Sequence, residues 1–290
     1  MRKDHLRLIT DTGKTLDLGW DYGIPYSIEP LNGIDVELQL AQGTTQTGRK
    51  VERQSVAGVS REIVAHFWRE DGEQAAKVFL DSLPYFTRGT LYLGDKWFCR
   101  FVLSKTPYTV QIEPYPVLDF MVYCEKPYWY DLTLQRFAIG GYSPAFHFPV
   151  NFHTHRYGVK NSDTFVNALN PGSLPVPFTA TLSCTSSVTD PRVVNMETGG
   201  YIGLSGVTLT SDDTVEFYTD TDDHLAVKRT RAGVEENLFA YLDEDSTLIQ
   251  LAPGDNLLRL SAASGANALQ VVVQFYPMVS GILPEVDDAD

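Results

Sequence analysis

The last third of the chain alternates apolar and polar residues with a period of two, in at least six short segments separated by turn signals. Between positions 178 and 184, every second residue is apolar or cysteine and the others are threonine or serine. A period of two is typical of strands with one buried and one solvated face. The positions on the apolar face of the series are Phe178, Ala180, Leu182, Cys184, Val215, Phe217, Leu225, Val227, Thr247, Ile249, Leu251, Leu258, Leu260, Leu269, Val271, Val273 and Phe275. With the turn at Pro253–Asn256, this pattern predicts an antiparallel β-sandwich or jelly roll without a helix.

The first half of the chain also predicts strands, with one short helix near 74–83. Apolar residues at Ala76, Phe79, Leu80 and Leu83 fall on one stripe of that helix, and Pro84 ends it. Val36, Leu38 and Leu40 alternate before a polar loop, Gln42–Arg53, which we interpret as the tip of a long hairpin. Further strands are predicted at Arg61–Trp68, Gly89–Leu93, Lys96–Leu103, Thr109–Glu113 and Val117–Cys124. The fold class is therefore all-β with one short helix.

The 290 residues suit two domains, each large enough to bury its own core. The aromatic cluster Lys126-Pro127-Tyr128-Trp129-Tyr130 follows the last strand of the first half, and we place the end of the first domain there. We expect an N-terminal β domain at 1–135, including the helix, and a C-terminal β-sandwich at 136–290. Residues 131–150 are interpreted as a connector.

Charge is distributed unevenly between these two halves. Residues 1–135 carry 15 Lys and Arg against 18 Asp and Glu, a net charge of −3, and residues 136–290 carry 8 against 19, a net charge of −11. An acidic surface disfavours nucleic acid and anionic membranes as partners. No run of about 18 apolar residues is present, so no membrane span is predicted. The first seven residues lack the apolar core of a secretory signal, and synthesis in a cytoplasm is expected. The odd number of cysteines, Cys99, Cys124 and Cys184, predicts buried thiols in the reduced form.

Two segments resemble binding motifs without meeting their structural requirements. Gly43–Lys50 approaches the spacing of a phosphate-binding loop, but arginine holds the lysine position and no helical stripe follows. We interpret it as a hairpin tip. His147, His153 and His155 form the one histidine cluster, and a zinc site requires at least three protein ligands. We interpret these as surface or interface histidines, and leave a site completed by Asp163 as an alternative.

Carboxylates at 220–223 and 243–245 could hold calcium, yet Asp220 onward lacks the glycine and terminal glutamate of an EF-hand loop. Aspartate is also a common turn residue. The sequence contains no HExxH motif, dinucleotide fingerprint or nucleophile elbow. We therefore predict a protein that is not an enzyme, with no catalytic, cofactor-binding or metal-binding residues and no cofactor.

The order of these features resembles the distal tail proteins of long-tailed phages that infect Gram-positive bacteria. In the first domain the resemblance rests on the strand with Arg61-Glu62-Ile63, the helix Ala76–Leu83, the strand pair around Leu91 and Trp97, and Lys126–Trp129. In the second domain it rests on Asn170–Ser173, Pro191, Thr198–Ile202 and Leu251–Asn256. The resemblance covers most of the chain.

The resemblance implies a structural virion protein that forms a homohexameric ring at the tail tip. The first domain would build the ring, and the second would be a galectin-like sandwich similar to carbohydrate-binding modules. The implied partners are the tail tube protein, the tail-associated fibre or lysin protein and receptor-binding proteins, with assembly in the host cytoplasm. A nearly neutral first domain is compatible with a ring, because repeated like charges across its interfaces are unfavourable. We therefore expect the ring interface within residues 1–135.

Two alternatives belong to other functional classes. A carbohydrate-binding, lectin-like protein that recognises host cell-wall glycans needs two or three aromatic rings on one concave sheet face. Tyr201, Tyr218 and Tyr241 are the scattered aromatic residues of the second domain that bear on this alternative. A glycosidase needs two carboxylates within reach of one bond, and the spacing singles out no pair.

Overall fold

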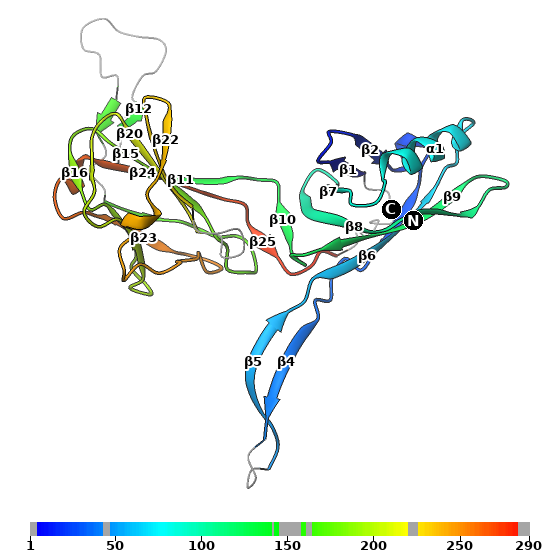
Figure 1. Ribbon diagram of the computed structural model, residues 1–290, viewed down its shortest axis with the longest axis horizontal. Coiled ribbons are helices and arrows are strands. Elements are labelled where there is room, and N and C mark those ends of the chain that lie inside the picture. Colours follow the sequence, from blue (N-terminus) through cyan, green and yellow to red (C-terminus); the bar gives the residue numbers. More distant parts are fainter. Residues whose placement is uncertain are drawn as a thin grey trace, which may run out of the picture. The chain divides into compact units, whose positions relative to one another are not determined.

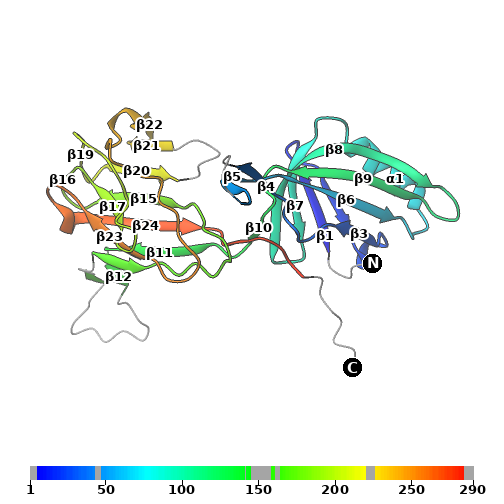
Figure 2. The ribbon, with the colours of Figure 1, turned by 90° about the horizontal axis from the view of Figure 1, so that it is seen from below.

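The computed structural model describes residues 5–42, 47–140, 142–144, 158–160, 164–219 and 226–283. Strands dominate these residues, which contain a single α-helix and three short 3-10 helices. The chain divides into two compact units (Figures 1 and 2). Unit 1 comprises residues 1–132 and 278–290, and unit 2 comprises residues 133–277. Within the described part of the chain, no helix has the length and apolar character needed to cross a lipid bilayer.

Unit 1 is an antiparallel β structure carrying one helix. Its strands are β1 (Leu6–Thr10), β2 (Thr15–Leu18), β3 (Tyr26–Glu29), β4 (Val36–Ala41), β5 (Lys50–Val56), β6 (Val59–His66), β7 (Arg88–Leu93), β8 (Trp97–Gln111), β9 (Val117–Cys124), β10 (Trp129–Asp131) and β25 (Met278–Val279). The helices are η1 (Trp20–Tyr22) and α1 (Gly72–Ser82). The main sheet runs β2-β1-β7-β8-β9-β6-β3, with β10 joined to β8 and β25 joined to β10, while β4 and β5 form a separate pair.

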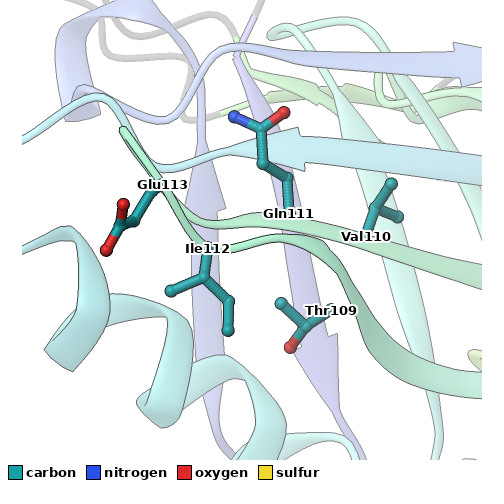
Figure 3. A pocket seen from close by; sticks show the side chains of 5 residues that line it. All are labelled: Thr109, Val110, Gln111, Ile112 and Glu113. Atoms are coloured by element: carbon teal, nitrogen blue, oxygen red, sulfur yellow. The ribbon is translucent and has the colours of Figure 1, made fainter.

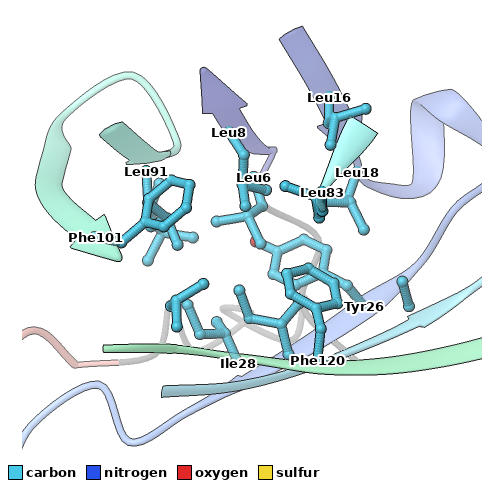
Figure 4. Packing of buried hydrophobic residues seen from close by; sticks show 14 of the residues in the cluster. Leu6, Leu8, Leu16, Leu18, Tyr26, Ile28, Leu83, Leu91, Phe101 and Phe120 are labelled. Carbon is cyan, nitrogen blue, oxygen red and sulfur yellow. The ribbon is translucent and has the colours of Figure 1, made fainter. Parts of the chain in front are cut away.

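The core of unit 1 lies between opposite parts of this sheet. Leu6, Leu8 and Leu91 approach from one side and Ile28 and Phe120 from the other (Figure 4). Alternation explains this placement, since β1 buries every second residue and directs the others outward. The helix α1 adds Phe79, whose ring meets that of Phe67 edge to face with centroids 5.3 Å apart.

A buried arginine fastens the closing segment of unit 1 to its sheet. Arg61 on β6 donates hydrogen bonds to the carbonyl oxygens of Pro30 and, at 3.0 Å, Pro127. Its guanidinium carbon lies 4.4 Å from the ring centroid of Trp129, which is fully buried and donates its indole N–H to Leu31 O at 2.9 Å. These contacts join β6, the turn before β4 and the start of β10 in one cluster.

Two buried thiols adjoin this cluster. The Sγ atoms of Cys99 and Cys124 are 3.7 Å apart. The hydrogen bond from Cys99 and the Arg61 charge lower the pKa of Cys124 to about 7, whereas the pKa of Cys99 is raised by the same bond and by burial. All three cysteines are free and buried, which confirms the expectation of reduced thiols.

Unit 2 is a β-sandwich, and the predicted fold class is confirmed. Its strands are β11 (Gln135–Ile139), β12 (Tyr142–Pro144), β13 (Gly158–Lys160), β14 (Phe165–Asn167), β15 (Thr179–Cys184), β16 (Val188–Thr189), β17 (Arg192–Asn195), β18 (Tyr201–Gly203), β19 (Thr208–Leu209), β20 (Asp213–Tyr218), β21 (Ala226–Arg231), β22 (Val234–Asn237), β23 (Leu257–Ser261) and β24 (Leu269–Phe275), with η2 (Phe239–Tyr241) and η3 (Ala266–Ala268). The two main sheets run β11-β24-β15-β20-β21-β22 and β14-β23-β17-β18. Ala180 and Val271 of the first sheet and Val193 and Leu258 of the second are buried.

The structure departs from the sequence expectations in several places. The helix is 72–82, slightly earlier than 74–83. The two strands predicted at 96–103 and 109–113 are one strand, β8, interrupted by shifts of register beside buried Pro107. Residues 247–251 form no strand; Leu251 makes an isolated bridge to Val176 instead. Residues 278–283 belong to unit 1, whereas the sequence predicts that all residues after 135 lie in the second domain.

Replacing the buried arginine should destabilise unit 1. We expect Arg61→Met to lower the free energy of unfolding by about 2–4 kcal/mol, because two buried carbonyl groups lose their donors. All four tryptophans lie in unit 1, so tryptophan fluorescence during denaturation follows that unit. Arg100→Met, at an exposed position of β8, is the matched control and should change stability by less than about 0.5 kcal/mol. Equal effects of the two variants would contradict this role of Arg61.

A buried carboxylate makes the stability of unit 2 depend on pH. Asp213 accepts two 2.6 Å hydrogen bonds from Arg231 and two from Thr210, and the Arg231 bond is the main cause of its lowered pKa. A lowered pKa means that this stabilisation is present above the ordinary aspartate value of about 3.9 and is lost as pH falls further.

We therefore expect Asp213→Asn to destabilise unit 2 by about 2 kcal/mol at neutral pH. The difference from wild type should shrink steadily as pH falls below about 3.9. Calorimetry across pH measures the effect, and the tryptophan transition of unit 1 should stay in place. Exposed Asp212→Asn serves as the control. A difference independent of pH would show that the Asp213 charge is not responsible.

Candidate interaction surface

The hairpin β4–β5, here called the arm, projects from the sheet of unit 1 without covering any part of it (Figure 1). Every described residue of the two strands is exposed or half-buried. Five of these are large aliphatic residues with 39–53% of their surface exposed: Val36, Leu38, Leu40, Val51 and Val56. An isolated two-stranded hairpin is marginally stable in water, so an arm of this kind gains stability when another surface covers it.

Pairing places these aliphatic side chains on one face of the arm. Val36 pairs with Val56, and Leu40 pairs with Val51. A bulge between Gln39 and Leu40 shifts the register, which lets two valines five positions apart share a face. The intervening residues of β4, including Glu37, lie on the opposite face and are polar or small. The arm is thus amphipathic, with an apolar face directed to solvent.

The base of the arm is fixed where it enters the main sheet. The Ala57 N–H donates to Asp35 O at 3.2 Å, closing the pair below β4 and β5. Gly58 follows, and a Cβ at this position would lie 2.3 Å from the Tyr123 hydroxyl oxygen on β9. The same Cβ would lie 2.8 Å from the backbone carbonyl oxygen of Cys124, which a side chain cannot displace, so glycine is required where the chain passes from the arm into β6.

The segments that resembled binding motifs do not form such sites in the described residues. Gly43 to Gln46 lie outside the described residues, and Lys50 begins strand β5, so no helix N-terminus follows the phosphate-loop-like segment. His147, His153, His155, Asp163 and the carboxylates at 220–223 also lie outside the described residues. Within the described ranges, no three His, Cys, Asp or Glu side chains converge on a metal position.

Two side chains considered for other functions have structural partners. Asp243, from the second carboxylate loop, accepts a 2.6 Å hydrogen bond from Arg192. The same guanidinium lies 4.8 Å from the ring centroid of Tyr201. One face of the Tyr201 ring is therefore occupied by a cation and is not a free platform for a sugar. Sequence reasoning found β4 of the arm but missed β5, because the bulge breaks the alternation of Lys50–Val56.

The chain is similar to known proteins in its fold and not in its sequence. No protein-family model and no curated protein matches the chain. A solved structure of phage SPP1, described as the Dit (gp 19.1) protein and a paradigm of hub adsorption apparatus in Gram-positive infecting phages, matches with a TM-score of 0.63 and 12% identity, over 93% of this chain and 98% of that chain. The chain has the fold of a phage distal tail protein.

A second match is to a chain of a phage baseplate. A chain of the phage P2 baseplate in its activated conformation with calcium matches with a TM-score of 0.52 and 14% identity, over 97% of this chain and 100% of that chain. Both similarities extend across the two units. The resemblance drawn from the sequence is confirmed at the level of the fold.

The exposed apolar face of the arm should be replaceable without loss of folding. At concentrations low enough to keep the protein as single copies, we expect Leu38→Ser combined with Leu40→Ser to change the stability of unit 1 by less than about 0.5 kcal/mol, because neither side chain is buried in the single copy. Binding of a fluorescent hydrophobic dye should fall. Tryptophan-detected denaturation and dye titration measure the two effects, and a large loss of stability would show that the arm packs on its own unit.

Proposed function

We propose that this protein is a structural component of a phage tail tip, a distal tail protein whose unit 1 assembles into a homohexameric ring. The observation that carries this proposal is the amphipathic arm, which leaves five aliphatic side chains in solvent on a unit with the distal tail fold. In a closed ring, each copy would cover the apolar face of its neighbour's arm, so no copy would leave this face exposed.

The charge of unit 1 is concentrated in its C-terminal segment. Residues 1–132 carry a net charge of −3, and residues 278–290, with four acidic residues and no basic ones, bring unit 1 to −7, the same net charge as unit 2. A ring contact made within the nearly neutral residues 1–132 would avoid strong mutual repulsion between copies. Unit 2 would then be a galectin-like sandwich available to peripheral components.

The expected partners follow from a position at the end of a tail. One face of the ring would meet the tail tube protein and the other the tail-associated fibre or lysin protein, with receptor-binding proteins attached around it for host adsorption. The ring would assemble in the cytoplasm of the bacterial host and function in the virion. Among these contacts, self-association is the one that the purified chain can test directly.

Light scattering on the purified protein tests the proposal. Across a range of concentrations and salt, we expect the mass of a hexamer or an equilibrium between dimer and hexamer. The variant with Leu38→Ser and Leu40→Ser should shift toward monomer, because the covered apolar face is lost. Gln39→Ser, on the opposite face of the same strand, should assemble like wild type. A wild-type protein that remains monomeric at every concentration contradicts a self-assembling ring.

A further inference from the structure

The most exposed large hydrophobic side chain of the described residues lies in the turn between α1 and β7. Phe86 has 87% of its surface exposed and the preceding Tyr85 has 75%. Their rings meet edge to face with centroids 5.2 Å apart. Two adjacent aromatic rings held away from the protein in this manner are unfavourable in water, and aromatic residues of this kind are typical anchors of protein interfaces.

The backbone under Phe86 is also unfavourable for a phenylalanine. Its φ is +66°, in the left-handed region where a Cβ is crowded. Pro84 to Thr87 form a turn in which Phe86 occupies the third position, which glycine normally takes when φ is positive. Neither burial nor backbone geometry within this copy explains a phenylalanine here. Strain of this kind at an exposed position is a reason to look for a function.

The turn is nevertheless firmly anchored. The Thr87 N–H and hydroxyl both donate to Pro84 O, at 3.3 and 2.6 Å. The Leu103 N–H donates to Thr87 O at 2.8 Å, which ties the turn to β8, and the neighbouring Leu83 is buried. We call Tyr85 and Phe86 the aromatic knob. Because its base is fixed in the free protein, little conformational entropy would be lost on binding.

Unit 1 also carries a hollow suited to such a knob. Thr109 to Glu113, at the far end of β8, line an open cavity of about 530 Å³ (Figure 3). Val110 and Ile112 in this segment are 57% and 62% exposed. The volume lies within the range of about 300–1,000 Å³ over which protein pockets hold organic groups. The hollow is open to solvent and its volume is large enough for aromatic rings; its lining combines the apolar side chains of Val110 and Ile112 with polar neighbours.

The knob and the hollow lie near opposite ends of α1. The knob follows the C-terminal end of the helix. The hollow adjoins the N-terminal end of the helix. Gln111 of the hollow pairs with Val117 on β9, and Val117 pairs with His66 on β6. Phe67 follows His66 in the chain and packs against Gly72, the first residue of α1. The eleven-residue helix between them spans about 16 Å. A contact between knob and hollow therefore joins two copies.

We propose that the aromatic knob of one copy inserts into the Thr109–Glu113 hollow of a second copy of this chain. Charge complementarity favours this occupant, since exposed Arg88 follows the knob and exposed Glu113 lines the hollow. The two surfaces differ, so the contact is head to tail, the type that closes into a ring when the rotation permits. This inference rests on the proposed self-assembly and names a contact that is separate from the arm.

Phe86→Gly separates assembly from folding. Glycine relieves the left-handed backbone, so the tryptophan-detected midpoint of unfolding, measured at concentrations that keep the protein as single copies, should be unchanged or higher. The association constant of the full-length protein should fall at least about tenfold. Ile112→Ser should weaken association in the same way. Val234→Ser, which removes a 70% exposed valine from unit 2, is the control and should have no effect. Sedimentation and light scattering measure all three.

Charge exchange tests which surfaces meet. Arg88→Glu and Glu113→Arg should each weaken association, and the double variant should recover toward the wild-type value because the pair is restored with reversed sign. Wild-type assembly with unchanged association of Phe86→Gly overturns the knob and leaves the proposed ring intact. A loss with Phe86→Gly but none with Ile112→Ser overturns the hollow as the receptor. A monomeric wild type overturns both the contact and the ring.

Discussion

The buried contact between Arg61 and Trp129 is the interaction on which the architecture of unit 1 depends. The guanidinium is held by two backbone carbonyls and one indole ring, and these partners come from segments that no hairpin connects. A charge in a protein interior is stable only when its polar neighbours are fixed. The cluster therefore holds the start of β10 in place, and β10 is the strand that accepts β25 from the far end of the chain. Removing either partner would loosen the point where both segments of unit 1 meet.

The exposed apolar surfaces of unit 1 contrast with this ordered interior. The arm and the aromatic knob both place hydrophobic side chains in solvent, and the turn that carries the knob is tied to β8 by the hydrogen bond from Leu103 N–H to Thr87 O. A rigid exposed anchor loses little conformational entropy on association, which favours assembly. The same exposed apolar side chains lower the solubility of the single copy. This balance is a common property of proteins that function as oligomers and are synthesised as separate chains.

The sequence predicted the sandwich of unit 2 well because its alternation is strict. Alternate residues of a strand lie on the same face, so one face of each strand must be buried in the core. This holds for Ala180 and Leu182 on β15 and for Val271 and Val273 on β24. Strands β1 to β3 were missed although Leu6 and Leu8 alternate in the same way, since short segments carry a weak signal. The return of Met278 to β10 had no local signature, because pairing between distant segments is decided by tertiary packing. The exposure of Phe86 could not be predicted either, since a phenylalanine before a strand is ordinarily buried.

The discontinuity of unit 1 has a consequence for its biogenesis. Its last strand, β25, lies after the whole of unit 2, so the partners of Trp129 and Tyr130 on β25 become available only after the ribosome has translated residues 133–277. At a synthesis rate of about 5–20 residues per second, this interval is roughly 7–30 s. During translation, unit 2 can therefore fold before the edge of β10 is covered. A nascent chain released early would present that edge uncovered, which links the completion of unit 1 to the completion of the polypeptide.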